Sequence, residues 1–337
     1  MKADHRHALR LALETIAEPP APGHARFLNA SPVPELTERW KEAFICEQAF
    51  RPDYLALQRQ AYHVKSLVDI DRSVALSVFL LGRNRRWNAY QITRMWNQMS
   101  AGSSIIVAGN KNEGIGSIRK WFSQYADVQN SFSKYHSIVF RASVTEGLKF
   151  PALEIEKQVE AYHLREGVFS ADGPDTGSQL LLETVDQRIA GKVADFGAGW
   201  GYLSCELPGK TENIVEIDLY EADENALNLA RTNLELARRR FASFPDASFH
   251  WIDVVSEFPK KPYDWVIMNP PFHVGRAQEP HLGQRFIEIA SSTLKHGGRL
   301  LMVANKNLPY ERALQTNFRS FEKLLERDGF KVFEASR

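Results

Sequence analysis

The sequence predicts an α/β protein of two tandem domains, each a mostly parallel sheet with helices on its faces. The first observation is length, because 337 residues exceed the size that a single hydrophobic core usually serves. The second is pattern: from Lys192 onward, short apolar runs alternate with amphipathic stretches, as in a parallel sheet covered by helices. The third is a fainter version of this alternation in the first half.

In the second half, five apolar runs predict successive strands, KVADFG, IVEIDLYE, SFHWID, YDWVIMN and GRLLMVAN. Residues 223–241 are expected to form a helix capped by Asp223, with an apolar face of Ala226, Leu227, Ala230, Leu234 and Ala237. Before the fifth strand, QRFIEIASSTLKHGG predicts another helix, whose inward residues are Phe286, Ile287, Ala290 and Leu294. The chain then ends in a predicted helix, FEKLLERDG, and an edge strand, FKVFEAS.

In the first half, SVALSVFLL and SSIIVAGN predict strands on either side of a helix, AYQITRMWNQM. The octet IIVAGNKN, which ends at Asn112, resembles LLMVANKN, which ends at Asn307. This similarity favours an ancient duplication of one domain, with chance similarity of two strand-loop junctions as the alternative. We place the two domains at residues 1–155 and 156–337. The apolar spacing of the connecting segment KFPALEIEKQVEAYHLREG allows a helix packed between them.

Composition bounds the class of protein. Hydrophobic residues make up 44% and charged residues 25%, as in ordinary soluble domains. Lys plus Arg number 42 against 41 for Asp plus Glu, so a nucleic-acid partner would have to be bound by local basic patches. The two cysteines, Cys46 and Cys205, match no metal-ligand spacing, which argues against a disulfide framework or zinc site. No apolar run suits a signal peptide or a membrane span, so we expect a cytoplasmic protein.

A glycine-rich loop, Asp195-Phe-Gly197-Ala-Gly199-Trp-Gly201, follows the first strand of the second half. Glycines let such a loop turn sharply and let a cofactor approach the backbone at a helix N-terminus. A dinucleotide fingerprint requires glycine at its sixth position, where this chain has Tyr202. Glycines at positions one, three and five instead resemble the S-adenosylmethionine (SAM) loop of class I methyltransferases. A purely structural glycine turn is the alternative.

Carboxylates stand at the ends of the next two strands. Glu221 closes IVEIDLYE, where it can accept hydrogen bonds from a ribose diol, and Asp253 closes FHWID, where it can accept from an adenine amino group. Each alone is compatible with a solvated acid at a strand end. Their order together with Asp195 on consecutive strands favours a cofactor site.

The turn Asn269-Pro270-Pro271-Phe272-His273 follows the fourth strand. Consecutive prolines prevent the strand or a helix from continuing, so they fix an extended turn. The Asn269 side-chain oxygen and the Pro270 carbonyl can accept both hydrogens of an aromatic amine and orient its lone pair. Phe272 can stack on a base that is flipped into the pocket. The alternatives are a proline-stiffened surface turn and, for His273, a packed structural histidine instead of a contact to base or phosphate.

The segments GVFSADGPDTGSQLLL, DFGAGWGYLS, NPPFH and VANKNLPY together resemble the bacterial RsmC-type ribosomal RNA guanine methyltransferases. The resemblance implies two tandem Rossmann-like methyltransferase domains, of which the N-terminal one is degenerate and the second catalytic. It implies methyl transfer from SAM to the 2-amino group of a guanine in 16S (small-subunit) ribosomal RNA. We expect a monomer, and we expect no metal because the sulfonium of SAM already supplies an activated leaving group. By matching positions, Asn269 to Phe272 hold the guanine, and the SAM site is bordered by Phe169, Gly177, Ser178, Asp195, Gly197, Gly199, Gly201, Glu221, Asp253 and Asn269.

The chain departs from the family at Trp200, where smaller residues are usual in the glycine loop, and throughout its first half. That half is expected to help bind RNA. Its Arg83-Asn-Arg85-Arg86-Trp87 run combines cations for phosphate with an aromatic for base stacking, although a solvated charged turn explains it equally simply.

Other functions remain open from sequence. With the same chemistry, the target could be a large-subunit rRNA guanine, an adenine amino group, or a glutamine side chain in a protein. The chain could instead be a non-catalytic RNA-binding ribosome assembly factor that keeps the fold. A nicotinamide oxidoreductase is disfavoured by the glycine spacing and by the Asn-Pro-Pro turn.

Overall fold

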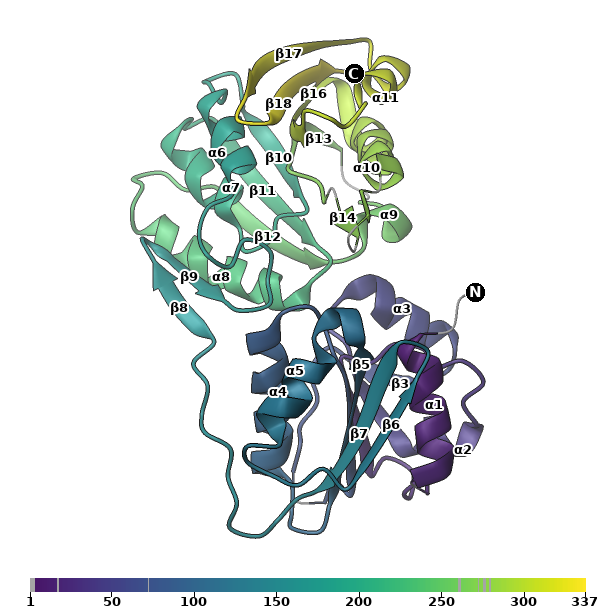
Figure 1. The fold of residues 1–337 in the computed structure, drawn as a ribbon. Helices are drawn as coiled ribbons and strands as arrows, with labels where there is room; N and C mark the ends of the chain where they lie inside the picture. Colours follow the sequence, from purple (N-terminus) through teal and green to yellow (C-terminus); the bar gives the residue numbers. More distant parts are fainter. Residues whose placement is uncertain are drawn as a thin grey trace. The chain divides into compact units, whose positions relative to one another are not determined.

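The computed structural model describes residues 4–16, 18–71, 73–259, 262–271, 273–274, 277–278 and 280–337. The chain divides into two compact units, residues 1–155 and 156–337 (Figure 1). Each unit contains one seven-stranded sheet. The expected α/β architecture with two tandem sheets is therefore confirmed.

The first unit orders its sheet β3-β2-β1-β4-β5-β7-β6, with β7 antiparallel to both of its neighbours. Its strands are β1 (Ala25–Leu28), β2 (Phe44–Glu47), β3 (His63–Lys65), β4 (Leu76–Leu80), β5 (Ser104–Asn110), β6 (Asn130–Lys134) and β7 (Ser137–Ser143). Its helices are α1 (His5–Ile16), α2 (Glu38–Ala43), α3 (Arg51–Arg59), α4 (Arg85–Gln98) and α5 (Ile115–Phe122), with a short 3-10 helix at Lys111–Glu113.

The second unit repeats this topology, with its sheet in the order β12-β11-β10-β13-β16-β18-β17. Its sheet strands are β10 (Gly191–Phe196), β11 (Ile214–Glu221), β12 (Asp246–Trp251), β13 (Tyr263–Met268), β16 (Leu294–Asn305), β17 (Ser320–Arg327) and β18 (Phe330–Ser336). Its helices are α6 (Thr176–Glu183), α7 (Tyr202–Glu206), α8 (Glu224–Arg238), α9 (Val254–Glu257), α10 (Pro280–Thr293) and α11 (Glu311–Asn317), with a 3-10 turn at Leu207–Gly209. Two short hairpins, β8 (Glu156–Val159) with β9 (Tyr162–Arg165) and β14 (His273–Val274) with β15 (Ala277–Gln278), lie outside the sheet.

The repeated strand order explains the sequence echo between the halves. The octets IIVAGNKN and LLMVANKN contain the ends of β5 and β16, which occupy the same fifth position in their sheets. Both octets therefore come from the same place in the fold, as a duplication requires.

A hydrophobic core covers each face of each sheet. In the second unit one core includes α6, α7 and α8, and the other includes α10 and α11, so the sheet lies between two helical layers (Figure 1). The predicted cap of α8 is confirmed, because the Asp223 side chain accepts a hydrogen bond from the Asn225 N–H. The predicted apolar faces of α8 and α10 are buried as well.

The C-terminal prediction was wrong in two respects. The segment expected to be a helix, FEKLLERDG, forms strand β17, and β18 lies inside the sheet between β16 and β17. Asp328 and Gly329 both have positive φ values, 52° and 83°, as a tight hairpin turn requires. The Asp-Gly pair was the local signal for this hairpin, and pairing with β18 outweighs the helical propensity of the Glu, Lys and Leu residues.

The helix that the apolar spacing allowed at the domain boundary does not form. The segment forms the β8–β9 hairpin, whose turn includes Glu160 at φ 54°. Tyr162 and Leu164 alternate toward the core of the second unit. The buried Asn233 side chain of α8 bonds both backbone groups of His163, over 2.7 and 3.1 Å, and the Trp200 carbonyl over 3.0 Å.

Replacing Asn233 with alanine should lower the free energy of unfolding by about 2 kcal/mol, because buried backbone groups at His163 and Trp200 lose their partners. Urea unfolding measures this loss. Asn228→Ala is the matched control, since Asn228 lies on the same helix with an exposed side chain. Equal stabilities for the two variants would contradict the proposed role of the Asn233 amide.

Candidate active site

The carboxyl edge of the second sheet brings the predicted site together. In the parallel register, Phe196 pairs with Tyr220 on β11 and with Met268 on β13. The next residues of these strands and loops, Gly197, Glu221 and Asn269, therefore follow at one edge of the sheet. Residues separated by more than seventy positions in sequence are neighbours because the strands are parallel and in register.

The glycine loop has an open face and a packed face. Gly197, Gly199 and Gly201 all have positive φ values, 73°, 57° and 88°. A Cβ atom added to Gly199 would meet nothing within 4 Å, and one added to Gly197 would have its nearest neighbours at 3.9 Å. At Gly201 it would meet Leu234 Cδ1 at 2.9 Å. The first two glycines leave space above the backbone, whereas Gly201 permits packing of the loop on α8.

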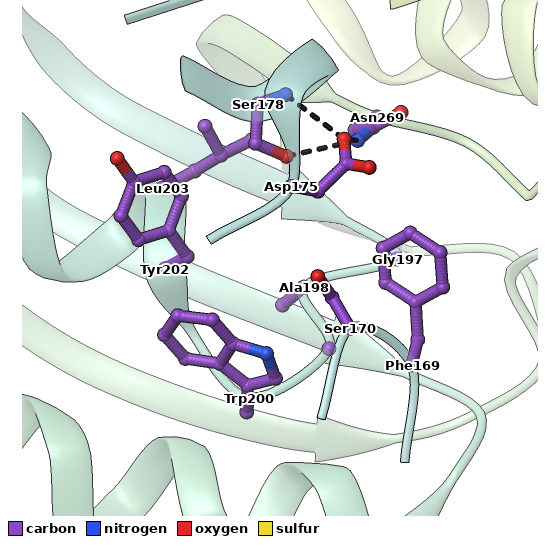
Figure 2. A pocket seen from close by; sticks show the side chains of 11 residues that line it. Phe169, Ser170, Asp175, Ser178, Gly197, Ala198, Trp200, Tyr202, Leu203 and Asn269 are labelled. Carbon is purple, nitrogen blue, oxygen red and sulfur yellow. Dashed lines mark hydrogen bonds between the residues drawn. The ribbon is translucent and has the colours of Figure 1, made fainter. Parts of the chain in front are cut away.

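That space is a cavity of about 370 Å³, part of which is open to solvent. Figure 2 shows side chains from the segment before α6, the glycine loop, α7 and the end of β13 around it. Phe169 stands at the cavity with 66% of its surface exposed, whereas Trp200 is buried against Tyr162 and Tyr202. The lining residues are Phe169, Ser170, Asp175, Ser178, Gly197, Ala198, Gly199, Trp200, Tyr202, Leu203 and Asn269.

Glu221 is fixed beside this cavity by backbone donors. Its Oε2 accepts from the Gly199 N–H over 2.8 Å, and its Oε1 accepts from the Asp223 N–H over 2.8 Å. Burial raises the pKa of Glu221 to about 7, against these hydrogen bonds, which lower it. A carboxylate in this position is poised to accept further hydrogen bonds from a ligand that favours its ionised form.

Asp195 is the fully buried last-but-one residue of β10. Its Oδ2 accepts from the Ser204 hydroxyl over 2.7 Å, and its Oδ1 has no hydrogen-bond partner in the described part of the chain. Desolvation by burial raises the pKa of Asp195 to about 7. A buried carboxylate oxygen without a donor is costly unless a ligand or water supplies one.

Asn269 follows β13 with its side-chain amide held at the nitrogen end. Its Nδ2 donates to Asp175 Oδ2 and to Ser178 Oγ, each over 2.8 Å (Figure 2). Pro270 is buried, and the exposed Pro271 lies beside Gly197, with its Cδ 3.9 Å from where a Cβ added to that glycine would lie. Asn269 therefore borders the glycine-loop cavity and does not point into the protein core.

Gly177 and Asp253, two predicted site residues, do not line the cavity. Gly177 lines no part of the cavity, because its Cα faces Phe330, which an added Cβ would meet at 3.0 Å. The Asp253 carboxylate caps α9, accepting from the Val255 N–H and the Ser256 hydroxyl. Phe272 lies outside the described residues, and of His273 the structure describes only its place at the start of β14.

Sequence reasoning missed Asp175, Ser170, Tyr202 and Leu203 as cavity residues. Only Asp175 carried a local signal, because it precedes an apolar helical stretch and caps α6 through the Ser178 N–H. Its contact with Asn269 spans 94 residues, so sequence spacing gave no indication of it.

The equivalent edge of the first unit carries different side chains. Its equivalent loop after β1 begins Asn29-Ala-Ser and contains no glycine. Glu47, which ends β2 as Glu221 ends β11, is buried and bound by both terminal guanidinium nitrogens of Arg94 over 3.0 and 2.8 Å. The Val68 N–H also donates to it, so an internal ion pair occupies this carboxylate.

In the described ranges, no group of three or more His, Cys, Asp or Glu residues is arranged to hold a metal ion. No described helix combines the length and apolarity needed to cross a bilayer. Cys46 and Cys205 are free and buried, and burial raises the pKa of both thiols.

Comparison with known proteins agrees with this architecture. Residues 161–334 match the family model described as Methyltransferase small domain, and residues 34–162 match Methyltransferase small domain N-terminal. The chain is 32% identical over 265 residues to Ribosomal RNA small subunit methyltransferase C of Erwinia tasmaniensis, covering 77% of this chain and 74% of that protein. The chain belongs to the ribosomal RNA small subunit methyltransferase C family.

A second relative has similar identity and coverage, and a solved structure has the same fold. The protein of that name from Haemophilus influenzae is 29% identical over 290 residues, covering 83% of this chain and 84% of the relative. The solved T. thermophilus 16S rRNA N2 guanine methyltransferase, in complex with AdoMet and guanosine, matches with a TM-score of 0.77. That match covers 99% of this chain and 93% of the other at 22% identity, and it supports the shared fold of the methyltransferase.

Proposed function

We propose that this methyltransferase transfers a methyl group from SAM to the 2-amino group of a guanine in 16S ribosomal RNA. The observation that carries the proposal is the juxtaposition of Asn269 with the open glycine face at the edge of the second sheet. A methyl donor and an amine acceptor site are needed side by side, and this edge offers both. Family membership favours small-subunit RNA as the substrate.

The residues present suit SAM. Gly197 and Gly199 leave room for the cofactor against the backbone, and Glu221 offers acceptors for its ribose hydroxyls. The unpartnered Asp195 Oδ1 favours a ligand or ordered water that supplies a donor. When bound, SAM supplies a methyl group on a sulfonium, which is already an activated leaving group.

The protein then has to orient the amine. The lone pair of a guanine amino group is delocalised into the ring, which makes it a poor nucleophile. Asn269 Oδ1 and the Pro270 carbonyl accept the two amine hydrogens and thereby turn the lone pair toward the cavity. The two prolines fix the backbone between these acceptors, and the surplus proton leaves to water after the transfer.

The first unit is proposed to contact RNA through the turn before α4. Arg83 and Arg85 are exposed there, whereas Arg86 donates to the Glu154 carbonyl over 2.7 Å. Trp87 stacks on Tyr90 with ring centroids 5.3 Å apart. Arginine charge beside an aromatic pair is the chemistry that binds phosphate and unpaired bases.

A methyl-transfer assay tests the proposed function. The protein is incubated with methyl-labelled SAM and either small subunits, large subunits or naked 16S RNA from a strain lacking the enzyme. Label in 2-methylguanosine from small-subunit RNA is the expected result. Label in adenosine, protein or large-subunit RNA would redirect the assignment, and SAM binding without transfer would indicate an assembly factor.

SAM affinity should fall as pH drops below about 7, because burial raises the pKa values of Asp195 and Glu221 to about 7 while donor groups on the ligand favour their ionised forms. Each carboxyl that must release a proton contributes up to about a tenfold loss per pH unit below its pKa. Calorimetric titration between about pH 5.5 and 8.5 measures this dependence. Glu221→Gln should remove the share of Glu221 from the slope and leave that of Asp195, and a pH-independent dissociation constant in the wild type would contradict this coupling.

A further inference from the structure

We propose that Asp175 is a positioning residue that fixes the rotamer of the Asn269 amide and so presents its oxygen to the substrate amine. This inference rests on the proposed function, because it assigns the origin of the acceptor geometry at the same site. Asp175 caps α6 and lines the cavity together with Ser178 and Asn269 (Figure 2).

The chemistry of the three side chains determines the orientation. An ionised carboxylate only accepts hydrogen bonds, so it must face the NH₂ end of a neighbouring amide. Asp175 Oδ2 and Ser178 Oγ each lie 2.8 Å from Asn269 Nδ2, which uses both hydrogens of that nitrogen. Rotating the amide by a half-turn would place its oxygen against the Asp175 carboxylate. The orientation that leaves Oδ1 for the ligand is therefore strongly favoured.

Gly177 makes this contact possible. A Cβ atom added there would meet Asp175 Oδ2 at 3.0 Å and the Phe330 ring at 3.0 Å. The absent side chain lets the carboxylate lie close to the first turn of α6 and still reach Asn269. Donation from Nδ2 to a carboxylate also polarises the amide, which strengthens its oxygen as an acceptor.

One oxygen, Asp175 Oδ2, accepts from both the Ser178 N–H that it caps and Asn269 Nδ2. Asp175→Asn removes the charge that excludes the flipped Asn269 rotamer, because the new amide can turn its NH₂ toward Asn269 Oδ1 at the cost of that one cap bond. A single cap bond contributes modestly to stability, so α6 should persist and the melting temperature should fall by only a few degrees. We expect kcat to fall about 10- to 100-fold, as for a misplaced reacting group, while KM for RNA and the SAM dissociation constant change less than about threefold.

Asp172→Asn is the matched control, because it removes the same charge from the same loop, at a side chain that is 97% exposed and bonded to Lys157. It should retain wild-type kcat. The positioning role is overturned if Asp175→Asn also retains kcat within about threefold. It is overturned equally if the variant raises KM by as large a factor as it lowers kcat.

A second measurement does not depend on methyl transfer. With asparagine labelled by ¹⁵N, the Asn269 side-chain NH₂ signal is assigned by its loss in Asn269→Ala. Slow proton exchange is expected in the wild type and faster exchange in Asp175→Asn, because two hydrogen bonds protect Nδ2. Equal exchange would refute the inference even in an active enzyme, whereas slow exchange in an enzyme that methylates no guanine would refute only the proposed function.

Discussion

Replacing Asn269 with alanine is expected to lower kcat between about 100- and 1,000-fold while changing SAM affinity by less than about threefold. In the proposed function the side chain accepts a hydrogen of the substrate amine through Oδ1, so its loss leaves the lone pair delocalised and misdirected. SAM is proposed to bind the glycine loop and Glu221 instead, and these are hydrogen-bonded to one another without Asn269. Single-turnover transfer to small subunits and calorimetric SAM titration measure the two quantities separately.

The control for this variant is Asn307→Ala, which removes an exposed asparagine side chain from the loop after β16. It should leave both quantities near wild type. A fall in SAM affinity as large as the fall in turnover would mean that Asn269 holds the cofactor and not the amine.

Gly201→Ala is expected to lower the stability of the fold, whereas Gly199→Ala is expected to weaken SAM binding. At Gly201 the new Cβ would lie 2.9 Å from Leu234 Cδ1 and 3.2 Å from the Ala230 Cα, at φ 88°. Overpacking together with left-handed strain should cost about 4 kcal/mol and lower the melting temperature by roughly 10 °C. At Gly199 nothing lies within 4 Å, so backbone strain of about 1 kcal/mol is the main cost to stability.

The Gly199 variant should instead lose SAM binding, because its methyl group occupies the space proposed for the cofactor. We expect at least about a tenfold rise in the dissociation constant, equivalent to one lost contact of about 1.4 kcal/mol. Thermal unfolding and calorimetry on both variants make the comparison. If Gly199→Ala binds SAM normally, the open face of the loop is not the cofactor site.

The elements that sequence predicted correctly are those whose signals are local. The parallel strands of the second unit are continuous apolar runs, and α8 combines an apolar stripe with its own cap at Asp223. The Asn-Pro-Pro turn was placed after its strand for the same reason, since proline restricts the backbone through its own ring. None of these predictions required knowledge of a distant partner.

The errors occurred where a distant partner decides the conformation. The charged segment 320–327 becomes a strand only because β18 offers it a pairing edge, and 156–165 becomes a hairpin held by Asn233. The glycines divide in the same way. Gly199 and Gly201 look alike in the loop sequence, yet one faces open space and the other faces α8.

By itself the sequence determined the α/β class, the parallel strands and the chemistry at their ends, because backbone restriction and apolar periodicity act within a few residues. Only the tertiary structure decided which carboxylates lie near the cavity. It also decided that Glu47 forms an ion pair with Arg94 and that Asp175 accepts a hydrogen bond from Asn269. The contact between Glu47 and Arg94 spans 47 positions of the sequence, and the contact between Asp175 and Asn269 spans 94. Their geometry comes from sheet register and helix packing, which no local pattern encodes.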